Sequence, residues 1–300
     1  MVNTGSMRKV TLLSLVLCMG LMSLLGCTPE QVESVEARSE AYTVSGMPTL
    51  IVEGSNGSVR IEGREDLSEI QVVATLHAFG NTLEQAQERL EKLTVTMRQV
   101  KDKVTLTYQL PKEASSWRRR PTVDFDVLVP RATNIQVKLS NGNATVEGVV
   151  GSISAETENG NIASRDVEGL IAFQTNNGNL TVARATGPLS LKTSNGTIDV
   201  EAANVALDAQ TSNGDVHFSG RFVGPEHRMQ SSNGSLDVEI PPDSELSIEA
   251  SVGTGSISTT LPLTGDIEGK SWSAILNLPT SYLSLRTGNG SIQIRGLSGI

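Results

Sequence analysis

Glycine recurs every nine residues through the middle of this 300-residue chain, and this period constrains the fold more than any other feature. The second and fourth residues after each glycine are mostly aliphatic, for example Leu189 and Leu191. Alternate glycines follow an asparagine, so the full unit consists of two nine-residue halves; these asparagines are Asn141, Asn159, Asn177, Asn195 and Asn213. Self-similarity at a fixed period is the signature of a repeat architecture.

Each nine-residue half is long enough for one short β-strand and one turn. Side chains alternate between the two faces of a strand, so the two aliphatic residues after each glycine point the same way. Strands of successive units would stack in register about 4.8 Å apart. We therefore predict an all-β fold, a parallel β-solenoid with 18-residue coils that is similar to a right-handed β-helix. Leucine-rich repeats, propeller blades and left-handed hexapeptide helices fit less well, because their frames or periods differ.

Residues 1–26 have the pattern of an export signal. Arg8 and Lys9 precede an uncharged apolar run that ends before Cys27, and Met7 is an alternative start. The segment resembles a bacterial lipoprotein signal, which implies cleavage before Cys27 and acylation of that residue. An ordinary secretory signal or a membrane anchor is the alternative. After cleavage Cys27 would be the one remaining cysteine, as a thioether, which excludes a disulfide, a zinc site and a thiol nucleophile.

The balance of charges restricts the partners. The chain has 24 Lys and Arg against 33 Asp and Glu, a formal net charge of −9. Loss of Arg8 and Lys9 with residues 1–26, which contain no acid, changes this to −11. An acidic protein repels nucleic acid and anionic headgroups, so we expect no nucleic-acid partner and membrane attachment through acyl chains on Cys27. Thr28 resembles the sorting residue of outer-membrane lipoproteins; exposure to the periplasm or to the cell surface, and the oligomeric state, stay open.

The rest of the chain divides into three predicted parts. Residues 27–41 are polar and acidic without periodicity and predict a tether. Residues 42–130 predict a small β-rich N-terminal cap that contains one helix over residues 82–93. Residues 131–300 predict the solenoid repeat domain with its own C-terminal cap, because the open strand edges at the ends of a solenoid invite aggregation unless covered.

Local signals support the cap. Apolar residues over 82–93 share one helical face, and Thr82 with Gln85 forms a capping box at its start. Alternating apolar and polar residues on both sides of residues 100–103 predict a β-hairpin.

The repeated asparagines and the acids were considered as binding groups. A column of Asn carboxamides could bind sugar hydroxyls, but Asn-Gly is also a tight-turn signature, and we favour the turn. Calcium-binding nonapeptide rolls need aspartates in a fixed frame. Asp199, Asp208 and Asp215 form no column, so we expect no calcium site.

A second polar column has hydroxyl groups. Its members are Thr157, Thr175, Thr193, Thr211 and then Ser231. By strand alternation these side chains point inward, and we expect the stacked hydroxyls to bond to one another.

The remaining polar residues show no catalytic pattern. His77, His217 and His227 lack a repeated partner, and we expect His227 to lie in a solvent-exposed loop. The cluster of residues 118–120, three arginines beside Trp117, could bind an anion but more often marks a solvated loop. We expect no catalytic, cofactor-binding or metal-binding residue, and the single predicted site is lipidation at Cys27.

The tandem units with a preceding strand, helix and hairpin resemble a bacterial family of β-strand-repeat domains labelled as adhesins or as domains of unknown function. The resemblance covers residues 42–296 and rests on three segments, namely Asp124-Phe125-Asp126-Val127 with Leu139-Ser140-Asn141-Gly142, Thr193-Ser194-Asn195-Gly196-Thr197-Ile198, and Leu285-Arg286-Thr287-Gly288-Asn289-Gly290-Ser291-Ile292. It implies the fold and an adhesin-like role, and no catalytic residue is carried over.

These observations lead to one main hypothesis and two alternatives. We expect a non-catalytic cell-envelope lipoprotein whose repeats contact a surface, a glycan or a protein. A polysaccharide-active enzyme would need clustered acids with Arg or Lys on one face, which the repeats do not suggest. A periplasmic structural or sensing protein without an external ligand is the third reading.

Overall fold

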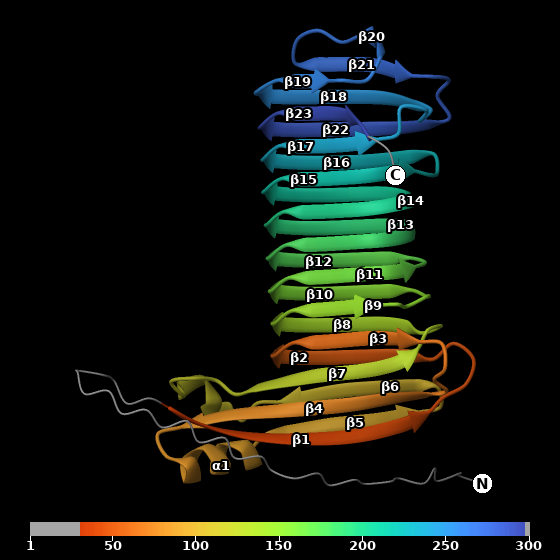
Figure 1. Cartoon of the computed structure of the whole chain (residues 1–300). Coiled ribbons are helices and arrows are strands. Elements are labelled where there is room, and N and C mark those ends of the chain that lie inside the picture. The colour runs from red at the N-terminus through yellow and green to blue at the C-terminus, as the bar shows by residue number, and fades with distance from the viewer. Residues whose placement is uncertain (1–30, 298–300) are drawn as a thin grey trace. The chain divides into compact units, whose positions relative to one another are not determined.

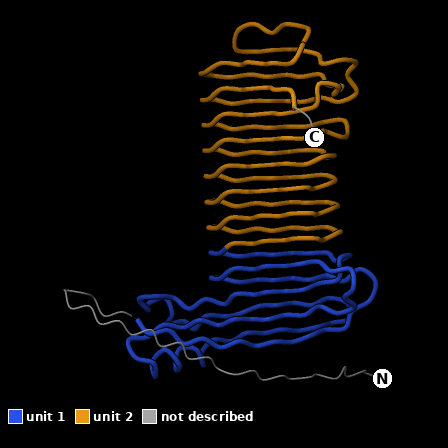
Figure 2. The backbone as a smooth tube through the Cα atoms, viewed as in Figure 1, with its two compact units in different colours: residues 1–142 blue, residues 143–300 orange. Residues whose placement is uncertain are grey.

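The computed structural model describes residues 31–297. These residues divide after Gly142 into two compact units, unit 1 before this boundary and unit 2 after it (Figure 2). Both units consist mainly of β-strands, and the part of the chain that is described contains one α-helix (Figure 1). Neither this helix nor any other in residues 31–297 is long and apolar enough to cross a membrane. The expected signal at residues 1–26 and the lipidation site Cys27 lie outside the described residues.

Unit 1 combines antiparallel strands with the first strands of the repeat. Its elements are β1 (Val32–Thr43), β2 (Thr49–Asn56), β3 (Val59–Arg64), β4 (Glu69–Gly80), α1 (Leu83–Glu91), β5 (Thr94–Val100), β6 (Lys103–Gln109), the 3₁₀ helix η1 (Lys112–Ser116), β7 (Thr122–Pro130) and β8 (Asn134–Asn141). Strand β4 pairs antiparallel with β1 and β7, and β7 pairs parallel with β3. The β5–β6 hairpin continues through parallel pairs β6–β2 and β2–β8.

The predicted tether is wrong from Val32 onward, because this segment is strand β1. It pairs with β4 along its whole length. The partly buried face of β1 is polar, and its charges are paired locally, as between Arg38 Nε and Glu36 Oε1 at 2.7 Å. The strand therefore depends on backbone pairing with β4, whose alternate residues are buried, and shows no apolar period of its own.

The local predictions for the cap are confirmed. The backbone N–H of Gln85 donates to Thr82 Oγ1 at 3.2 Å, and Gln85 Oε1 accepts from the N–H of Asn81 at 2.7 Å. The first bond caps α1 as the predicted capping box requires, whereas the second goes to the N–H of Asn81, one residue before the N-cap, and not to the N–H of Thr82. The hairpin turns at Lys101, whose φ is +55°.

Unit 2 is a stack of parallel strands with an antiparallel end. Its elements are β9 (Ala144–Glu147), β10 (Ile153–Asn159), β11 (Ile162–Glu168), β12 (Ile171–Asn177), β13 (Leu180–Asn195), β14 (Ile198–Asn213), β15 (Val216–Phe222), β16 (Glu226–Asn233), β17 (Leu236–Ile240), β18 (Leu246–Thr254), β19 (Ile257–Thr259), β20 (Thr264–Asp266), β21 (Ser271–Leu276), β22 (Ser281–Asn289) and β23 (Ile292–Gly296). Equivalent residues of successive coils pair in register, Ile171 with Leu189 and Leu189 with Leu207.

The core of unit 2 consists of the rows predicted from the repeat. The second and fourth residues after each glycine are buried. One of them, Ser164, is polar, and it takes the place of an aliphatic residue in its row. The rows also admit large rings, as with Phe173, which is buried between the small Ala155 and Leu191. The 18-residue period and the parallel pairing are consistent with a β-solenoid.

The repeated glycines allow the coils to approach closely. Gly196 has φ +157°, and a Cβ placed there would lie 2.0 Å from the carbonyl oxygen of Gly178. No other residue type fits at this distance, which explains the period in chemical terms. The coils are closed at this edge by backbone bonds such as Gly178 N–H to Asn195 O, 2.9 Å.

The coil order departs from the chain order at the C-terminal end. Strands β22 and β23 lie between the coil of β16 and β17 and the coil of β18 and β19 (Figure 1). The coil also lengthens by two positions between β14 and β16, since Asn195 pairs with Asn213 but Asn213 pairs with Asn233. The β20–β21 pair covers β18 through antiparallel bonds.

Candidate functional site

Outward-facing side chains of unit 2 form continuous columns, and two columns line a shallow groove of about 300 Å³. One column runs Thr181, Asp199, His217, Asp237, and the other runs Ala183, Glu201, Ser219, Glu239, Arg295. We call these residues the acidic groove. Parallel pairing places each at one strand spacing, about 4.8 Å, from its neighbour.

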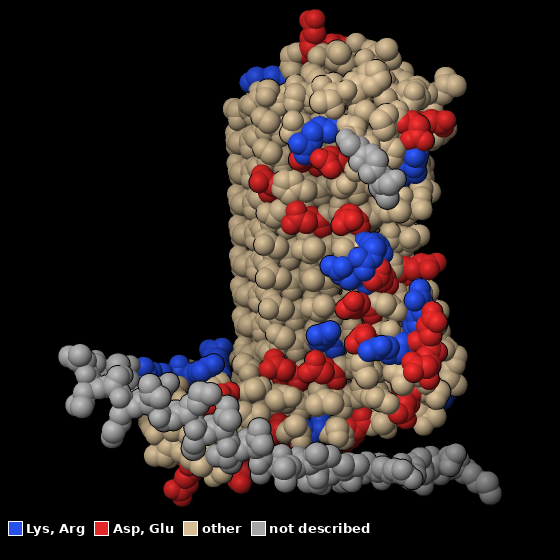
Figure 3. Space-filling model, viewed as in Figure 1, with Lys and Arg blue, Asp and Glu red and all other residues tan. Residues whose placement is uncertain are grey.

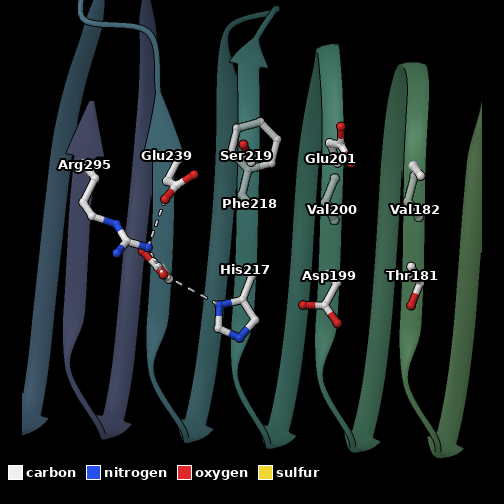
Figure 4. Close-up of a pocket in the computed structure, with 12 residues that line it drawn as sticks. Thr181, Val182, Asp199, Val200, Glu201, His217, Phe218, Ser219, Glu239 and Arg295 are labelled. Carbon is white, nitrogen blue, oxygen red and sulfur yellow. Dashed lines mark hydrogen bonds and ion pairs between the residues drawn. The ribbon is translucent and has the colours of Figure 1, made fainter. Parts of the chain in front are cut away.

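Ion pairs join the C-terminal part of the acidic groove, which lies at the left in Figure 4. Arg295 Nη2 contacts Asp237 Oδ2 and lies 3.0 Å from Glu239 Oε1. His217 Nδ1 lies 4.0 Å from Asp237 Oδ2. Four carboxylates against one guanidinium leave the groove negative, which favours a ligand that donates hydrogen bonds or carries positive charge.

The acidic groove was not predicted from the sequence. Asp199 and His217 are one repeat unit apart and could have been aligned by the repeat. Asp237 is displaced by the lengthening of its coil, and Arg295 enters the column only because β23 returns beside β17. The three aspartates considered in the sequence indeed form no column: Asp208 accepts from Gln210 Nε2, and Asp215 accepts from the N–H of Ser235. In residues 31–297, no group of three or more His, Cys, Asp or Glu could hold a metal ion.

A second groove of about 290 Å³ is lined by polar side chains, all of them neutral except Lys192. Its main column is Gln174, Lys192, Gln210 and Gln230, again in parallel register. Asn176, Ser194, Ser212 and Ser232 lie two residues further along the same strands. We call these eight residues the amide groove. Carboxamides and hydroxyls both donate and accept hydrogen bonds, so this groove suits a ligand with many hydroxyl groups.

The asparagines of the repeat form a ladder along the edge of unit 2. Each Nδ2 donates to the Oδ1 of the preceding coil, at 2.8 Å from Asn177 to Asn159 and 2.9 Å from Asn195 to Asn177. The left-hand edge of this unit in Figure 3, where strands such as β12 end, carries almost no charge. The ladder asparagines are absent from the non-glycine residues with positive φ, so they serve as a hydrogen-bonded ladder and the glycines supply the turn.

The hydroxyl column points inward as predicted, but its bonding was predicted wrongly. Thr175 is 1 % exposed, and its Oγ1 donates to the carbonyl oxygen of Gly160 at 3.0 Å. Thr193 and Thr211 make the same bond to Gly178 and Gly196. These hydroxyls do not bond to one another, because the glycine carbonyl beside each is a nearer acceptor.

His227 is not in an exposed loop, which corrects the prediction. It is the second residue of β16, where it pairs with Leu283; it is 2 % exposed and stacks on Phe222 with ring centroids 4.5 Å apart. Its Nδ1 accepts from the N–H of Leu207 at 3.4 Å, and burial lowers its pKa to about 4. The ring is therefore neutral and structural at pH 7.

The other candidates lie in unit 1. His77 Nε2 is 3.3 Å from Asp124 Oδ2, and its Nδ1 is 2.8 Å from Glu33 Oε1. Bonds to these carboxylates raise the pKa of His77. The arginines of residues 118–120 are exposed, and the guanidinium of Arg119 lies 3.6 Å from the centroid of the Phe79 ring.

In-register coils with continuous polar columns outside are the features of a β-solenoid repeat domain. The chain belongs to the family described as Toastrack DUF4097, whose model matches residues 49–295. Comparison with curated proteins gave no match.

Three solved structures are similar to the chain. A "putative adhesin" from Bacteroides fragilis has 14% identity and a TM-score of 0.41, over 91% of this chain and 100% of its own. A "putative cell adhesion protein" from Clostridium sporogenes has 11% identity and a TM-score of 0.28, over 89% and 100%. A "putative lipid binding protein" from Parabacteroides distasonis has 14% identity and a TM-score of 0.41, over 87% and 97%.

Proposed function

We propose that this chain is a non-catalytic lipoprotein of the bacterial cell envelope whose repeats make adhesin-like contacts with a glycan. The amide groove carries the proposal. Gln210 and Gln230 are registered neighbours at one strand spacing, and Gln174 lies one coil beyond Lys192, so a linear polymer lying across the strands meets a long polar side chain at each of these successive coils. Planar carboxamides provide both the donors and the acceptors that sugar hydroxyls require.

Binding of envelope and host glycans to the full chain tests this role. The triple variant Gln174→Ala, Gln210→Ala, Gln230→Ala removes about three hydrogen bonds of about 1 kcal/mol each, which corresponds to roughly hundredfold weaker binding. The control is Asp199→Asn with Glu201→Gln, which alters only the acidic groove. Equal affinities of the two variants, or no glycan bound by the parent chain, would contradict the proposal. The second of these outcomes favours a structural or sensing role without an external ligand.

The acidic groove favours a second candidate, a polysaccharide-active enzyme. Asp199 and Asp237 flank His217 at two strand spacings, about 9.6 Å, near the separation of the carboxyl groups in inverting glycosidases. Arg295 forms an ion pair with one of these two carboxylates, that of Asp237. This pairing supports a binding role over catalysis. Turnover of a polysaccharide that Asp199→Asn abolishes, and the amide-groove variant retains, would establish the enzyme.

The proposed membrane attachment uses acyl chains on Cys27, with the outer membrane as the destination. Palmitate labelling and membrane fractionation test it directly. The Cys27→Ser variant should incorporate no palmitate and leave the outer-membrane fraction. Label retained in that variant would refute acylation at this residue.

A further inference from the structure

The last coil of the chain, β22 and β23, lies between two coils that precede it in the sequence. Strand β22 pairs parallel with β16 on one side and with β18 on the other, and β23 does the same with β17 and β19 (Figure 1). Leu236 and Ile292 are direct neighbours in register although they are distant in sequence. We call the space that residues 281–296 occupy the slot.

The slot has the properties of a binding site for a strand pair. It takes up the aliphatic side chains of the last coil, and Leu283, Leu285, Ile292 and Ile294 are all 0 % exposed. Both of its walls present open parallel edges when the last coil is absent, which is the geometry in which an added strand gains main-chain bonds on two sides. The strands of both walls, β16 to β19, precede residues 281–296 in the chain.

A short hinge leads into the last coil. Residues 277–280 join β21 to β22, and Asn277 has φ +59°, a left-handed turn conformation that asparagine adopts more readily than most residues. Asn277 Nδ2 donates to the carbonyl oxygens of Pro242 and Ser244, at 3.0 and 2.7 Å. Leu278 is 81 % exposed. A short hinge that joins two separately packed elements is a place where copies of a chain can exchange one of the elements.

We propose that two copies of this chain associate by exchanging residues 281–296, each copy placing its last coil in the slot of the other. Residues 281–296 match the slot in register, so the partner whose coil fits in place of the chain's own is a second copy of this chain. Thr287 Oγ1 donates to the carbonyl oxygen of Gly234 at 2.6 Å, and Asn289 continues the asparagine ladder from Asn233. The exchanged coil makes the same contacts as the closed coil. The hinge and the protein concentration therefore decide the ratio of closed monomer to exchanged dimer.

A disulfide between neighbouring strands reports exchange. Arg228 of β16 and Ser284 of β22 are registered partners, and both side chains point outward. One tagged copy carries Arg228→Cys and another carries Ser284→Cys, each with Cys18→Ser and Cys27→Ser. The two are unfolded together in urea, refolded by dilution and oxidised. A disulfide between the two tags should form in an amount that rises with protein concentration.

The control uses a pair outside the slot. Asp208 and Arg228 are registered in the same way between β14 and β16, which belong to successive coils of the chain. Copies with Asp208→Cys and Arg228→Cys should give at least tenfold less mixed disulfide. An equal yield in both pairs, or none in the β16–β22 pair at any concentration, would overturn the proposal.

A shortened hinge tests the same proposal by size. Leu276, Leu246 and Ser281 are stacked, so the hinge must cross two strand spacings, about 9.6 Å. Deletion of residues 277–279 leaves two extended steps, about 7 Å, which cannot close onto the same copy. The variant should elute as a dimer, and a folded monomer would refute exchange. If the variant fails to fold, the disulfide experiment decides alone.

Discussion

Replacement of Gly196 by alanine tests the close approach of coils in unit 2. The new Cβ would lie 2.0 Å from the carbonyl oxygen of Gly178, whereas carbon–oxygen contacts lie near ~3.3 Å. The two coils must therefore separate by about 1.3 Å, which is more than a packed core absorbs without loss of contacts.

The cost follows from the bonds that separation breaks. Three of the hydrogen bonds that join the coils here lie closest to the clash: Gly178 N–H to Asn195 O at 2.9 Å, Thr193 Oγ1 to Gly178 O at 3.0 Å, and Asn195 Nδ2 to Asn177 Oδ1 at 2.9 Å. At about 1 kcal/mol each they sum to about 3 kcal/mol. The positive φ adds about 1–3 kcal/mol for a residue with a Cβ. We expect Gly196→Ala to lower the free energy of unfolding by roughly 4–6 kcal/mol.

Gly269 provides the matched control. It also has positive φ, at +72°, but a Cβ there meets no atom within 4 Å. Gly269→Ala should cost only about 1–2 kcal/mol. Urea unfolding followed by far-UV circular dichroism compares the two variants in the full chain. A midpoint shift for Gly196→Ala no larger than that of the control would refute the argument from close approach.

Three further predictions concern single side chains. Burial lowers the pKa of His227 to about 4, from 6.5 in the unfolded chain, so its contribution is full above pH 6.5 and roughly 3 kcal/mol is lost as the pH falls to 4. His227→Phe should remove this part of the pH dependence of the urea midpoint, and an unchanged slope would contradict the prediction. Bonds to Asp124 and then Glu33 raise the pKa of His77, so its contribution is full below pH 6.5 and is lost as the pH rises through the raised pKa. His77→Gln should therefore destabilise more at pH 5 than at pH 8, and the reverse order would be incompatible with the ion pairs. Ser164 has a buried Oγ without a hydrogen-bond partner and lies between Val146 and Val182. Ser164→Ala should therefore raise the thermal midpoint by the equivalent of about 1 kcal/mol. The control Ser190→Ala, at a half-exposed serine, should not raise it.

The repeat was readable from sequence because its contacts are regular. Residues one repeat unit apart touch throughout β10 to β14, so a pattern in the chain is a pattern in space. The buried aliphatic rows and the inward threonines follow from strand alternation alone. The helix start at Thr82 was likewise predictable because its bonds are local.

The features that were missed depend on contacts between distant residues. In the sequence, His227 looks like part of a loop insertion. In the structure it lies in strand β16, and its ring packs on Phe222. The acidic groove needs Arg295 beside Asp237, and only the return of the last coil brings them together. Strand β1 has no apolar period because β4 supplies the buried residues. None of these arrangements is encoded in a sequence period.

The edge of unit 2 also bears on chemical ageing. Asparagine before glycine ordinarily loses ammonia when the glycine nitrogen attacks the side-chain carbonyl carbon. In each stacked pair that nitrogen already donates to the next coil, as Gly196 N–H does to Asn213 O at 2.9 Å, and the carboxamide is held by its neighbours. Succinimide formation is thereby suppressed while the coils stay closed. A coil that opens loses this protection, and its asparagine can deamidate to aspartate. Aspartates in neighbouring coils would repel one another at one strand spacing, so deamidation would spread along the ladder from the first open coil.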